Sequence, residues 1–340
     1  MSAKRTLKIL VLFDTAGTPP EDQDFSAELK TEEWQTEADV IRTLKKMGHD
    51  VHALGIYEEI DLLYKTVKNL QPDIVFNLTE HFGGKGHLDK AVVGLFQMMD
   101  IPYTGCGPNG LMLCRHKALS KKLLSFHRIK NPPFTVFRVG EKKPLSPRVK
   151  LPCIVKLAND DASQGISQAS LVEIEEALYE RVKFIHEKFG DAALVEQFIP
   201  GRELYVSILG NKRIRAFPIR EVTFGNLPNG NNAFATYKTK FDKDYRKKWG
   251  IRYRFADLDQ DIEEHVLNMC KRAYKILKID GYARMDLRLT PTNQVVFIEA
   301  NPNPDLCTDE DFALSAEKAG LPFEKLLQKI VNLGLNKTYK

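Results

Sequence analysis

Apolar runs separated by amphipathic stretches divide the N-terminal part of the chain into alternating strands and helices. Residues 8–13, Lys-Ile-Leu-Val-Leu-Phe, form a continuous apolar run that is typical of a buried parallel strand. Residues 50–54 and 73–78 predict two more strands. Residues 31–47 and 61–70 between them have the spacing of helices. The alternation of strand and helix predicts a parallel α/β layer.

The pattern changes after residue 110, where helices and strands no longer alternate regularly. We expect helices at 91–99, 111–126, 171–188, 262–277 and 321–333, and strands at 151–157, 193–199 and 204–209. With Asn131-Pro-Pro133 as a further break, the chain is expected to contain three parts. These are an N-terminal α/β domain (1–110), a central sub-domain (111–192) and a C-terminal sub-domain (193–340).

Residues 282–303 form two strands joined by a turn at Thr290-Pro-Thr-Asn-Gln294. Strand alternation places Arg284, Asp286 and Arg288 on one face of the first strand. On the second strand it places Glu299 and Asn301 on the same face as Phe297, with Val296, Ile298 and Ala300 opposite. If residues 291–294 form the loop, Asp286 lies opposite Glu299 and Arg284 lies opposite Asn301.

Two interpretations of this hairpin remain open. Adjacent carboxylates repel unless a positive group joins them, and the neighbouring arginines would supply one in a salt-bridged sheet face. Alternatively, the oxygens of Asp286, Glu299 and Asn301 form a magnesium site, because this hard cation prefers oxygen ligands and retains room for water and phosphate.

Four other segments carry candidate chemistry. The loop 158–165 follows a strand that ends near Lys156, an arrangement able to cover phosphates. Glu196 lies in an apolar run, so it needs either a ligand with amino groups or a lysine of the protein. The loop at 79–89 contains Glu80 and His81 after a strand end, and is either a substrate pocket or simply a mobile loop.

Residues 225–255, rich in Gly, Asn and Lys, are long for an unstructured segment and suggest a lid. On the helix at 111–126, most of the charges of Arg115, Lys117, Lys121 and Lys122 are expected to face solvent.

Composition disfavours several classes of function. A net charge of +5 over 340 residues, with 43% hydrophobic and 28% charged residues, is typical of a soluble globular protein. No basic run with interleaved aromatics indicates nucleic-acid binding. Five scattered cysteines without a C-x-x-C pair favour a reducing compartment over zinc or redox chemistry. With no signal peptide or membrane-spanning stretch, we expect a cytosolic location.

In this order, the pieces resemble the ATP-grasp superfamily and, within it, the D-alanine–D-alanine ligase family. The resemblance covers nearly the whole chain and depends on residues 101–105, 116–118, 151–156, 195–203, 281–286 and 299–301. It implies an ATP-grasp fold in which the two C-terminal α+β sub-domains clamp ATP.

The resemblance also implies roles for individual residues. ATP would be bound by Lys117, Lys156, Ser163, Gly165, Glu196, Gln197, Phe198, Ile199 and Glu203. Two magnesium ions, which manganese can replace, would be held by Asp286, Glu299 and Asn301. Arg284 would stabilise charge at the reacting carbonyl, and Lys240 in the lid would reach the γ-phosphate. The implied reaction passes through an acyl phosphate, which an amine attacks to give an amide, ADP and phosphate.

The positions that hold the first substrate in the family differ here. The first turn is Phe13-Asp-Thr-Ala-Gly17, Ala162 replaces a serine, and Phe241 replaces a tyrosine. Residues 81–89 and 302–305 also depart from the family pattern. We therefore predict a substrate other than D-alanine, an amino acid or small peptide, with Glu80, His81, Asn303 and Asp305 contributing to its selection.

Three hypotheses follow. The first is a carboxylate–amine ligase with a substrate other than D-alanine, and the second is a true D-alanine–D-alanine ligase of cell-wall synthesis. The third is a nucleotide-binding module without catalysis, which the presence of Arg284 and of all three metal positions disfavours. The expected partners are small-molecule carboxylates and amines, with no nucleic acid or membrane, and the resemblance implies a homodimer.

Overall fold

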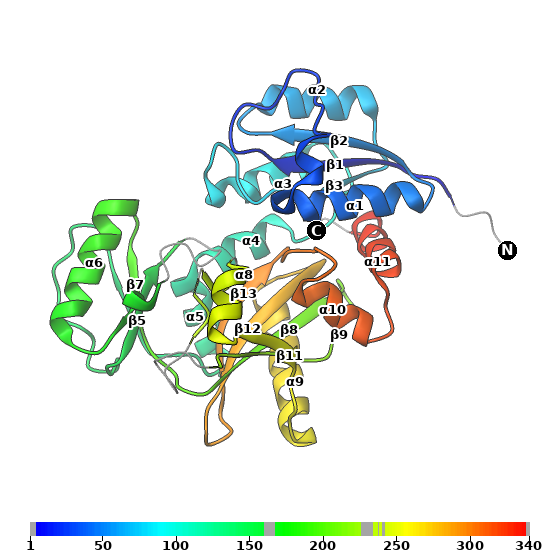
Figure 1. The fold of residues 1–340 in the computed structure, drawn as a ribbon. Helices are drawn as coiled ribbons and strands as arrows, with labels where there is room; N and C mark the ends of the chain where they lie inside the picture. The colour runs from blue at the N-terminus through cyan, green and yellow to red at the C-terminus, as the bar shows by residue number, and fades with distance from the viewer. Residues whose placement is uncertain (1–4, 160–166, 226–233, 237, 240–241, 338–340) are drawn as a thin grey trace.

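The N-terminal region of the computed structural model contains a parallel sheet with strand order β2-β1-β3 (Figure 1). The structure describes residues 5–159, 167–225, 234–236, 238–239 and 242–337. The strands are β1 (Lys8–Asp14), β2 (Asp50–Ile56) and β3 (Ile74–Asn77). The helices are α1 (Gln35–Lys46), α2 (Ile60–Leu70) and α3 (Asp89–Met98), with 3₁₀ turns η1 (Glu28–Lys30), η2 (Glu32–Trp34) and η3 (Gly86–Leu88). The predicted parallel α/β layer is confirmed.

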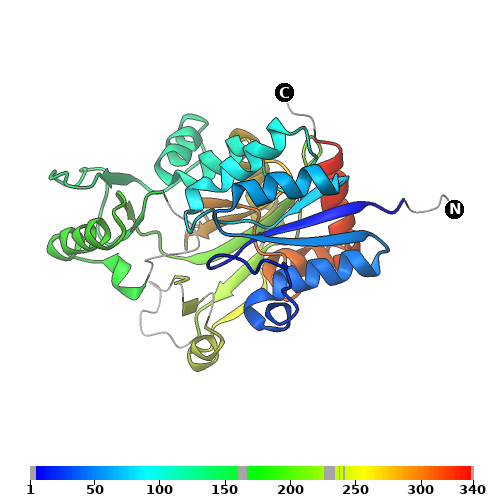
Figure 2. The ribbon, with the colours of Figure 1, turned by 90° about the horizontal axis from the view of Figure 1, so that it is seen from above.

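Both faces of this sheet are covered, as the continuous apolar run of β1 requires. Leu10 and Leu12 pack with residues of α2 and α3 on one face. Ile9 and Val11 pack on the other face with α1 and with α11 (Phe323–Leu335), which follows all the other elements along the chain. Figure 2 shows α11 lying beside α1 under the N-terminal strands. Residues far apart in the sequence therefore complete one core.

The central region has a four-stranded antiparallel sheet with strand order β4-β7-β5-β6, at the left of Figure 1. Two helices precede it where the sequence predicted one at 111–126. The chain breaks at His116, whose ψ of 78° leaves the helical region and whose side chain accepts a hydrogen bond from Leu119 N. The elements are α4 (Pro108–Arg115), α5 (Lys117–Phe126), β4 (Phe134–Phe137), β5 (Cys153–Leu157), η4 (Gln168–Ser170), β6 (Leu171–Val172), α6 (Glu175–Phe189) and β7 (Ala193–Gln197).

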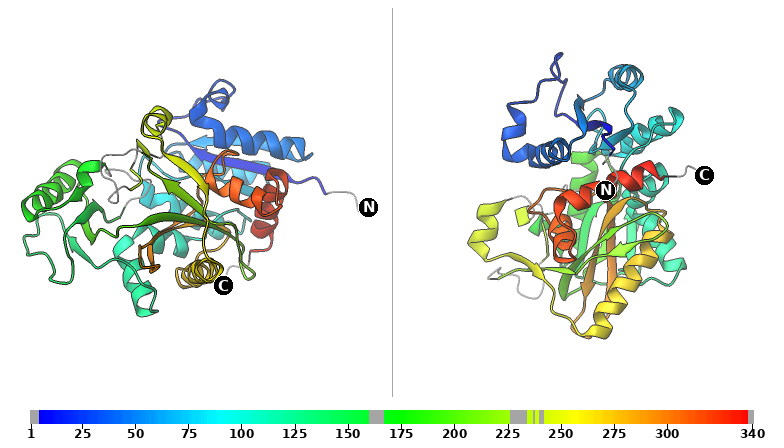
Figure 3. Two further views of the ribbon diagram at one scale, coloured as in Figure 1. Left: turned by 60° about the horizontal axis from the view of Figure 1, so that its bottom comes forward. Right: turned by 90° about the vertical axis from the view of Figure 1, so that its right-hand side faces the viewer.

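The C-terminal sheet has strand order β11-β10-β8-β12-β13, with β9 paired to β8. One face packs on α9 through residues such as Met285 and Leu287, and Figure 3 shows that helix alongside the sheet. The other face carries polar side chains such as Arg284 and Asp286. The elements are β8 (Arg202–Leu209), β9 (Arg215–Ala216), β10 (Arg220–Thr223), α8 (Lys243–Trp249), β11 (Arg252–Phe255), α9 (Gln260–Ile276), β12 (Tyr282–Leu289), β13 (Val295–Pro302) and α10 (Asp311–Lys318).

Two predicted elements need correction. The helix expected at 171–188 begins only at Glu175, because Leu171 and Val172 pair with β5 as strand β6. The segment 225–255 is not structureless throughout, since it contains helix α8 and strand β11. Asp242 accepts a hydrogen bond from Tyr245 N and caps α8 at its start.

The predicted border between residues 192 and 193 would separate β7 from its partners β4 and β5. Hydrogen bonding instead places the change of sheet after β7. The division of the chain into three parts otherwise stays a prediction. All five cysteines are free and buried. Among the described helices, none has the length and apolar character needed to cross a membrane.

Candidate functional site

Strands β12 and β13 pair in the predicted register. Asp286 lies opposite Glu299, and Arg284 lies opposite Asn301. A β-bulge follows, because Leu287 pairs with Phe297 and leaves Ile298 between the two pairs. Phe297 therefore packs in the core with Leu287, and the prediction that it shares a face with Glu299 is wrong. The bulge reverses the alternation on which that prediction depended.

Arg284 forms a two-pronged ion pair with Asp286. Its Nε and Nη2 donate to the two carboxylate oxygens over 2.8 and 3.0 Å, and its guanidinium lies 4.9 Å from the ring centroid of Tyr205. Burial alone would lower the pKa of Arg284, but the Asp286 carboxylate holds it well above its usual value. The salt-bridged interpretation of the hairpin is thus realised at this pair.

Four buried or half-buried charges form a chain between the central sheet and β13. Glu196 of β7 lies between two lysines: its Oε1 is 2.8 Å from Lys156 Nζ, and its Oε2 is 2.9 Å from Lys121 Nζ. Lys156 also contacts Glu299 Oε2 at 3.3 Å. Desolvation opposes ionisation of Glu196, yet the two lysines keep its pKa below the usual value. Glu196 therefore has lysine partners within the protein, as one of the two alternatives predicted, and it has two of them, Lys121 and Lys156.

The expectation that the charges of α5 mostly face solvent is wrong for two of them. Lys117 is 5% exposed and Lys121 is 1% exposed, whereas Lys122 is exposed. Arg115 at the end of α4 is also largely buried and pairs with Asp89 at 2.8 Å. Helical spacing predicts a face, but it does not show what packs against that face.

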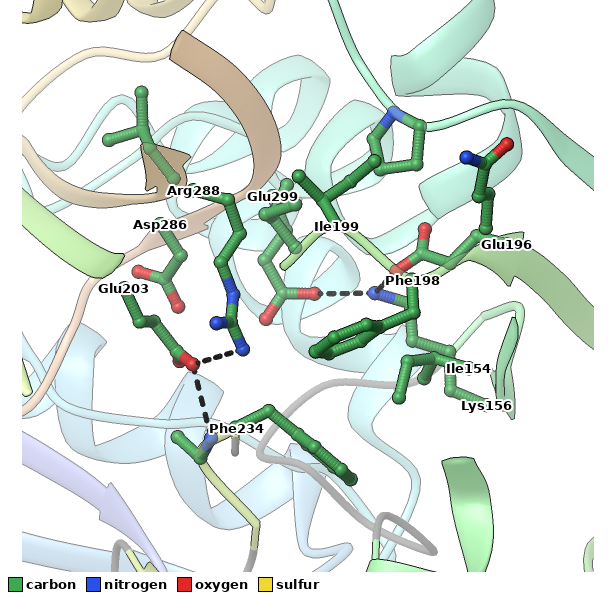
Figure 4. A pocket seen from close by; sticks show the side chains of 15 residues that line it. Ile154, Lys156, Glu196, Phe198, Ile199, Glu203, Phe234, Asp286, Arg288 and Glu299 are labelled. Carbon is green, nitrogen blue, oxygen red and sulfur yellow. Dashed lines mark hydrogen bonds and ion pairs between the residues drawn. The ribbon is translucent and has the colours of Figure 1, made fainter. Parts of the chain in front are cut away.

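Three of these four charges also line a pocket between the central and the C-terminal sheet (Figure 4). Six of the nine predicted ATP-binding residues line it, together with two of the three predicted metal ligands. Its lining is Pro132, Ile154, Lys156, Glu196, Gln197, Phe198, Ile199, Glu203, Phe234, Ala235, Asp286, Leu287, Arg288, Ile298 and Glu299. Residues separated by more than a hundred positions thus share one cavity, which combines apolar walls with a few converging charges.

At the other end of the pocket, Glu203 is held in place by several partners. Arg288 Nη2 lies 2.9 Å from Glu203 Oε2, Tyr205 Oη donates to Oε1 over 2.7 Å, and Ala235 N donates to Oε2 over 3.1 Å. The Arg288 guanidinium also stacks 5.3 Å from the ring centroid of Phe198. Strand alternation predicted Arg288 on this face, but no role in a binding site was predicted for it.

The hairpin oxygens suit a hard divalent cation in kind. Asp286 and Glu299 line the pocket, and Asn301 lies on the same face with its Nδ2 lacking a hydrogen-bond partner in the described structure. Within the described residues, no group of three or more His, Cys, Asp or Glu has the arrangement of a metal site. Two carboxylates and one amide leave positions for water and phosphate oxygens, as magnesium prefers. A cation here would compete with Arg284 and Lys156 for these oxygens.

The predicted substrate residues do not line this pocket, and two of them, Glu80 and His81, lie at the carboxyl end of β1. Asp14 accepts a hydrogen bond from Glu80 N at 2.7 Å and contacts His81 Nδ1 at 3.2 Å. Asp305 accepts from Thr36 Oγ1 at 2.5 Å, which links α1 to the loop after β13. Asn303 Oδ1 accepts from Cys106 N at 2.7 Å, so its side chain joins two loops of the fold.

We call Asp14, Glu37, Glu80, Asp305 and Glu310 the acidic cluster. Desolvation, together with neighbouring carboxylates, raises the pKa of Glu37, Glu80 and Glu310 to about 7. Within the described parts of the chain, none of these three glutamates forms an ion pair. Glu80 was predicted from the sequence, but Glu37 and Glu310 were not, because neither belongs to a motif or lies near the other along the chain.

Three predicted residues lie outside the described residues: Ser163, Gly165 and Lys240, as do Ala162 and Phe241. Lys117 and Asn301 do not line the pocket, and neither does Arg284. Lys117 begins α5, and its backbone N donates to Ala158 O, at the entry to the predicted phosphate loop. The ligand-binding role of each predicted site residue stays a prediction.

Residues 124–332 match the family model described as D-ala D-ala ligase C-terminus. The uncharacterized protein y4sG of Sinorhizobium fredii is 29% identical over 307 residues, covering 86% of this chain and 85% of that protein. The D-alanine–D-alanine ligase of Desulforudis audaxviator is 28% identical over 297 residues, covering 86% of this chain and 90% of that one. That of Proteus mirabilis is 28% identical over 270 residues, with 78% and 69% covered.

Solved structures agree on the fold. The D-alanine–D-alanine ligase of Bacillus anthracis complexed with ATP matches with a TM-score of 0.75 at 21% identity, covering 97% of this chain and 98% of that one. The enzyme from Coxiella burnetii matches with a TM-score of 0.68 at 19% identity, covering 97% and 94%. The predicted ATP-grasp fold is confirmed.

Proposed function

The chain belongs to the D-ala D-ala ligase C-terminus family, and we propose that it joins an amino acid or small peptide other than D-alanine to an amine. It is an ATP-dependent, ADP-forming ligase of the ATP-grasp fold that makes C–N bonds.

The observation that carries the nucleotide part is the shared pocket. Lys156, Glu196 and Glu203 line one cavity with Asp286 and Glu299, although they come from five different strands. ATP placed here would meet a carboxylate and apolar walls for its base, Glu203 for its ribose, and Lys156 for its phosphates. Magnesium held by Asp286, Glu299 and Asn301 would supply positive charge that stabilises the transferring phosphoryl group.

Side chains of the protein orient the phosphates, stabilise the oxyanion and exclude water. Lys156 orients the phosphates, and Arg284 donates hydrogen bonds to the oxyanion that forms when the amine attacks the acyl phosphate. Arg284 is fixed by Asp286 and Tyr205, so it needs little reorganisation. Water must be excluded, since it would hydrolyse the activated acyl group. Lys240 would assist at the γ-phosphate from the predicted lid.

The choice of substrate is supported by the residues around Glu80. Carboxylates of the acidic cluster favour an ammonium group on the substrate and disfavour a carboxylate placed beside them. Glu80, His81 and Asp305 belong to or adjoin this cluster. We further propose that the substrates are small molecules handled in the cytosol and that the chain is a homodimer.

A second candidate is D-alanine–D-alanine ligation itself, which the names of the curated relatives favour. Phosphate release with ATP and D-alanine alone separates the two. Saturable turnover at substrate concentrations on the order of 1 mM or below would establish the second candidate and overturn our proposal. We expect no such turnover.

The same assay over pairs of L- and D-amino acids, with mass spectrometry of the products, identifies the substrate. We expect one pair to give stoichiometric ADP, phosphate and an amide. Tight ADP binding without turnover for any amine or carboxylate offered would contradict ligation and support a non-catalytic nucleotide-binding module.

A further inference from the structure

Lys121 is a buried lysine whose place in the fold requires an explanation. Only 1% of its surface is exposed, although the next residue, Lys122, faces solvent from the same helix. Removing an ammonium group from water is costly unless its partners are well placed. Its Nζ donates to the backbone oxygen of Ile298 over 2.8 Å and lies 2.9 Å from Glu196 Oε2.

Both partners of Lys121 line the pocket, but Lys121 itself does not. Ile298 is the bulged residue of β13, and Glu299 follows it directly. Glu196 leads through Lys156 to the same Glu299. Lys121 therefore closes a ring of contacts that joins the central sheet to β13, the strand that carries the predicted metal ligands Glu299 and Asn301.

The two lysines of the ring differ, because Lys156 contacts two carboxylates and Lys121 contacts one. Lys156 now neutralises both Glu196 and Glu299, yet it is also the lysine proposed to bind ATP phosphates. When Lys156 turns toward a phosphate, Lys121 is the remaining cation at Glu196. Glu196 Oε1, which Lys156 Nζ contacts at 2.8 Å, is then left to accept a hydrogen bond from a ligand, while Oε2 stays beside Lys121.

We propose that Lys121 is a positioning residue for base recognition, acting through Glu196 without touching the nucleotide. It keeps the Glu196 carboxylate ionised and oriented to accept a hydrogen bond from the exocyclic amino group of adenine. Guanine carries a carbonyl oxygen at that position, which a fixed carboxylate repels. This inference deepens the proposed function and depends on the nucleotide occupying the pocket.

The test is the preference of the protein for ADP over GDP, measured by calorimetry on the intact chain. Wild type is titrated first, and we expect clear binding of ADP only. Lys121→Met should weaken ADP binding by about tenfold or more while changing GDP binding little, because an unsupported carboxylate discriminates less well. The exposed neighbour provides the matched control, since Lys122→Met should leave both affinities unchanged.

A purely structural role would lower stability without changing base preference, so two further variants separate the explanations. Lys121→Arg retains the positive charge and should keep part of the preference for ADP over GDP. This variant can be measured even if Lys121→Met fails to fold. In a Glu196→Gln background, replacing Lys121 by Met should cause little further loss of preference, because there is no carboxylate left to hold.

The outcomes are distinct. Wild type that binds neither nucleotide overturns the proposed function. Wild type that prefers ADP while Lys121→Met keeps the same preference overturns only the role of Lys121. Losses that simply add in the Lys121 and Glu196 double variant show that Lys121 does not act through Glu196, and also overturn the inference.

Discussion

The pocket and the acidic cluster differ in how their charges are balanced. In the pocket, Lys156 and Arg288 each pair with a carboxylate, and Glu196 has two cations. In the acidic cluster, Glu37 and Glu80 face other carboxylates, and burial raises the pKa of each to about 7. Ion-paired side chains are held in position, which suits a pocket that binds the same nucleotide in every reaction. Unbalanced carboxyl groups suit a substrate that brings its own positive charge.

Neutralising a carboxylate that lines the pocket should have the largest effect on turnover. Glu299→Gln keeps the shape of the side chain but removes one charge beside Asp286 and Lys156. We expect turnover to fall by at least about a hundredfold, because charge at the transferring phosphoryl group loses its support. Phosphate release measures the loss. Unchanged activity in the folded variant would remove Glu299 from the metal site.

Removing the lysine of the pocket should have the next largest effect. Lys156→Ala leaves Glu196 with Lys121 and leaves Glu299 without its lysine. We expect ADP affinity to fall by about tenfold to a hundredfold, because a charge-assisted contact to phosphate is lost. Calorimetric titration measures the affinity. The exposed Lys183→Ala serves as control, and an equal loss there would discount the phosphate contact.

The smallest effect should come from the acidic cluster and appear as a pH dependence. Glu37 and Glu80 have pKa values of about 7, raised from 4.5 by desolvation and by Asp14 and Asp305. The folded protein therefore holds protons that the unfolded chain releases between about pH 4.5 and 7, so stability falls as pH rises across this range. Melting temperatures across that range measure the trend.

Glu80→Gln removes one titrating group and should flatten that dependence, while the exposed Glu187→Gln should leave it intact. For an ammonium-bearing substrate, wild-type binding should strengthen from pH 6 to 8 as the carboxyl groups ionise. A melting temperature that rises from pH 5 to 7 would contradict the assignment of these pKa values.

Part of this molecule could be predicted from local chemistry alone. The turn at Thr290–Gln294 and the polar alternation of residues 284–288 predict the register that brings Asp286 to Glu299. The bulge could not be predicted, because Val295 to Ile298 is an unbroken apolar run without alternation to mark it.

Long-range partners set the remaining limit. The apolar run around Glu196 showed that a partner was needed, but not that Lys121 and Lys156 would both supply it. Glu37 approaches Asp305 only because α1 packs near the loop after β13, a contact that Thr36 and Asp305 secure, whereas Glu310 belongs to the same loop as Asp305. A sequence pattern records faces and turns, and only the folded chain shows which faces meet.

The packing of α11 against the N-terminal sheet has a consequence for synthesis. Ile9, Val11 and Phe76 of that sheet are covered in part by Leu326, Leu327 and Ile330. The strands of this sheet leave the ribosome long before α11 is synthesised, so one apolar face of the sheet stays uncovered through most of translation. We expect nascent chains stopped before α11 to associate with chaperones that hold exposed apolar surfaces, and to be released from them once that helix has emerged.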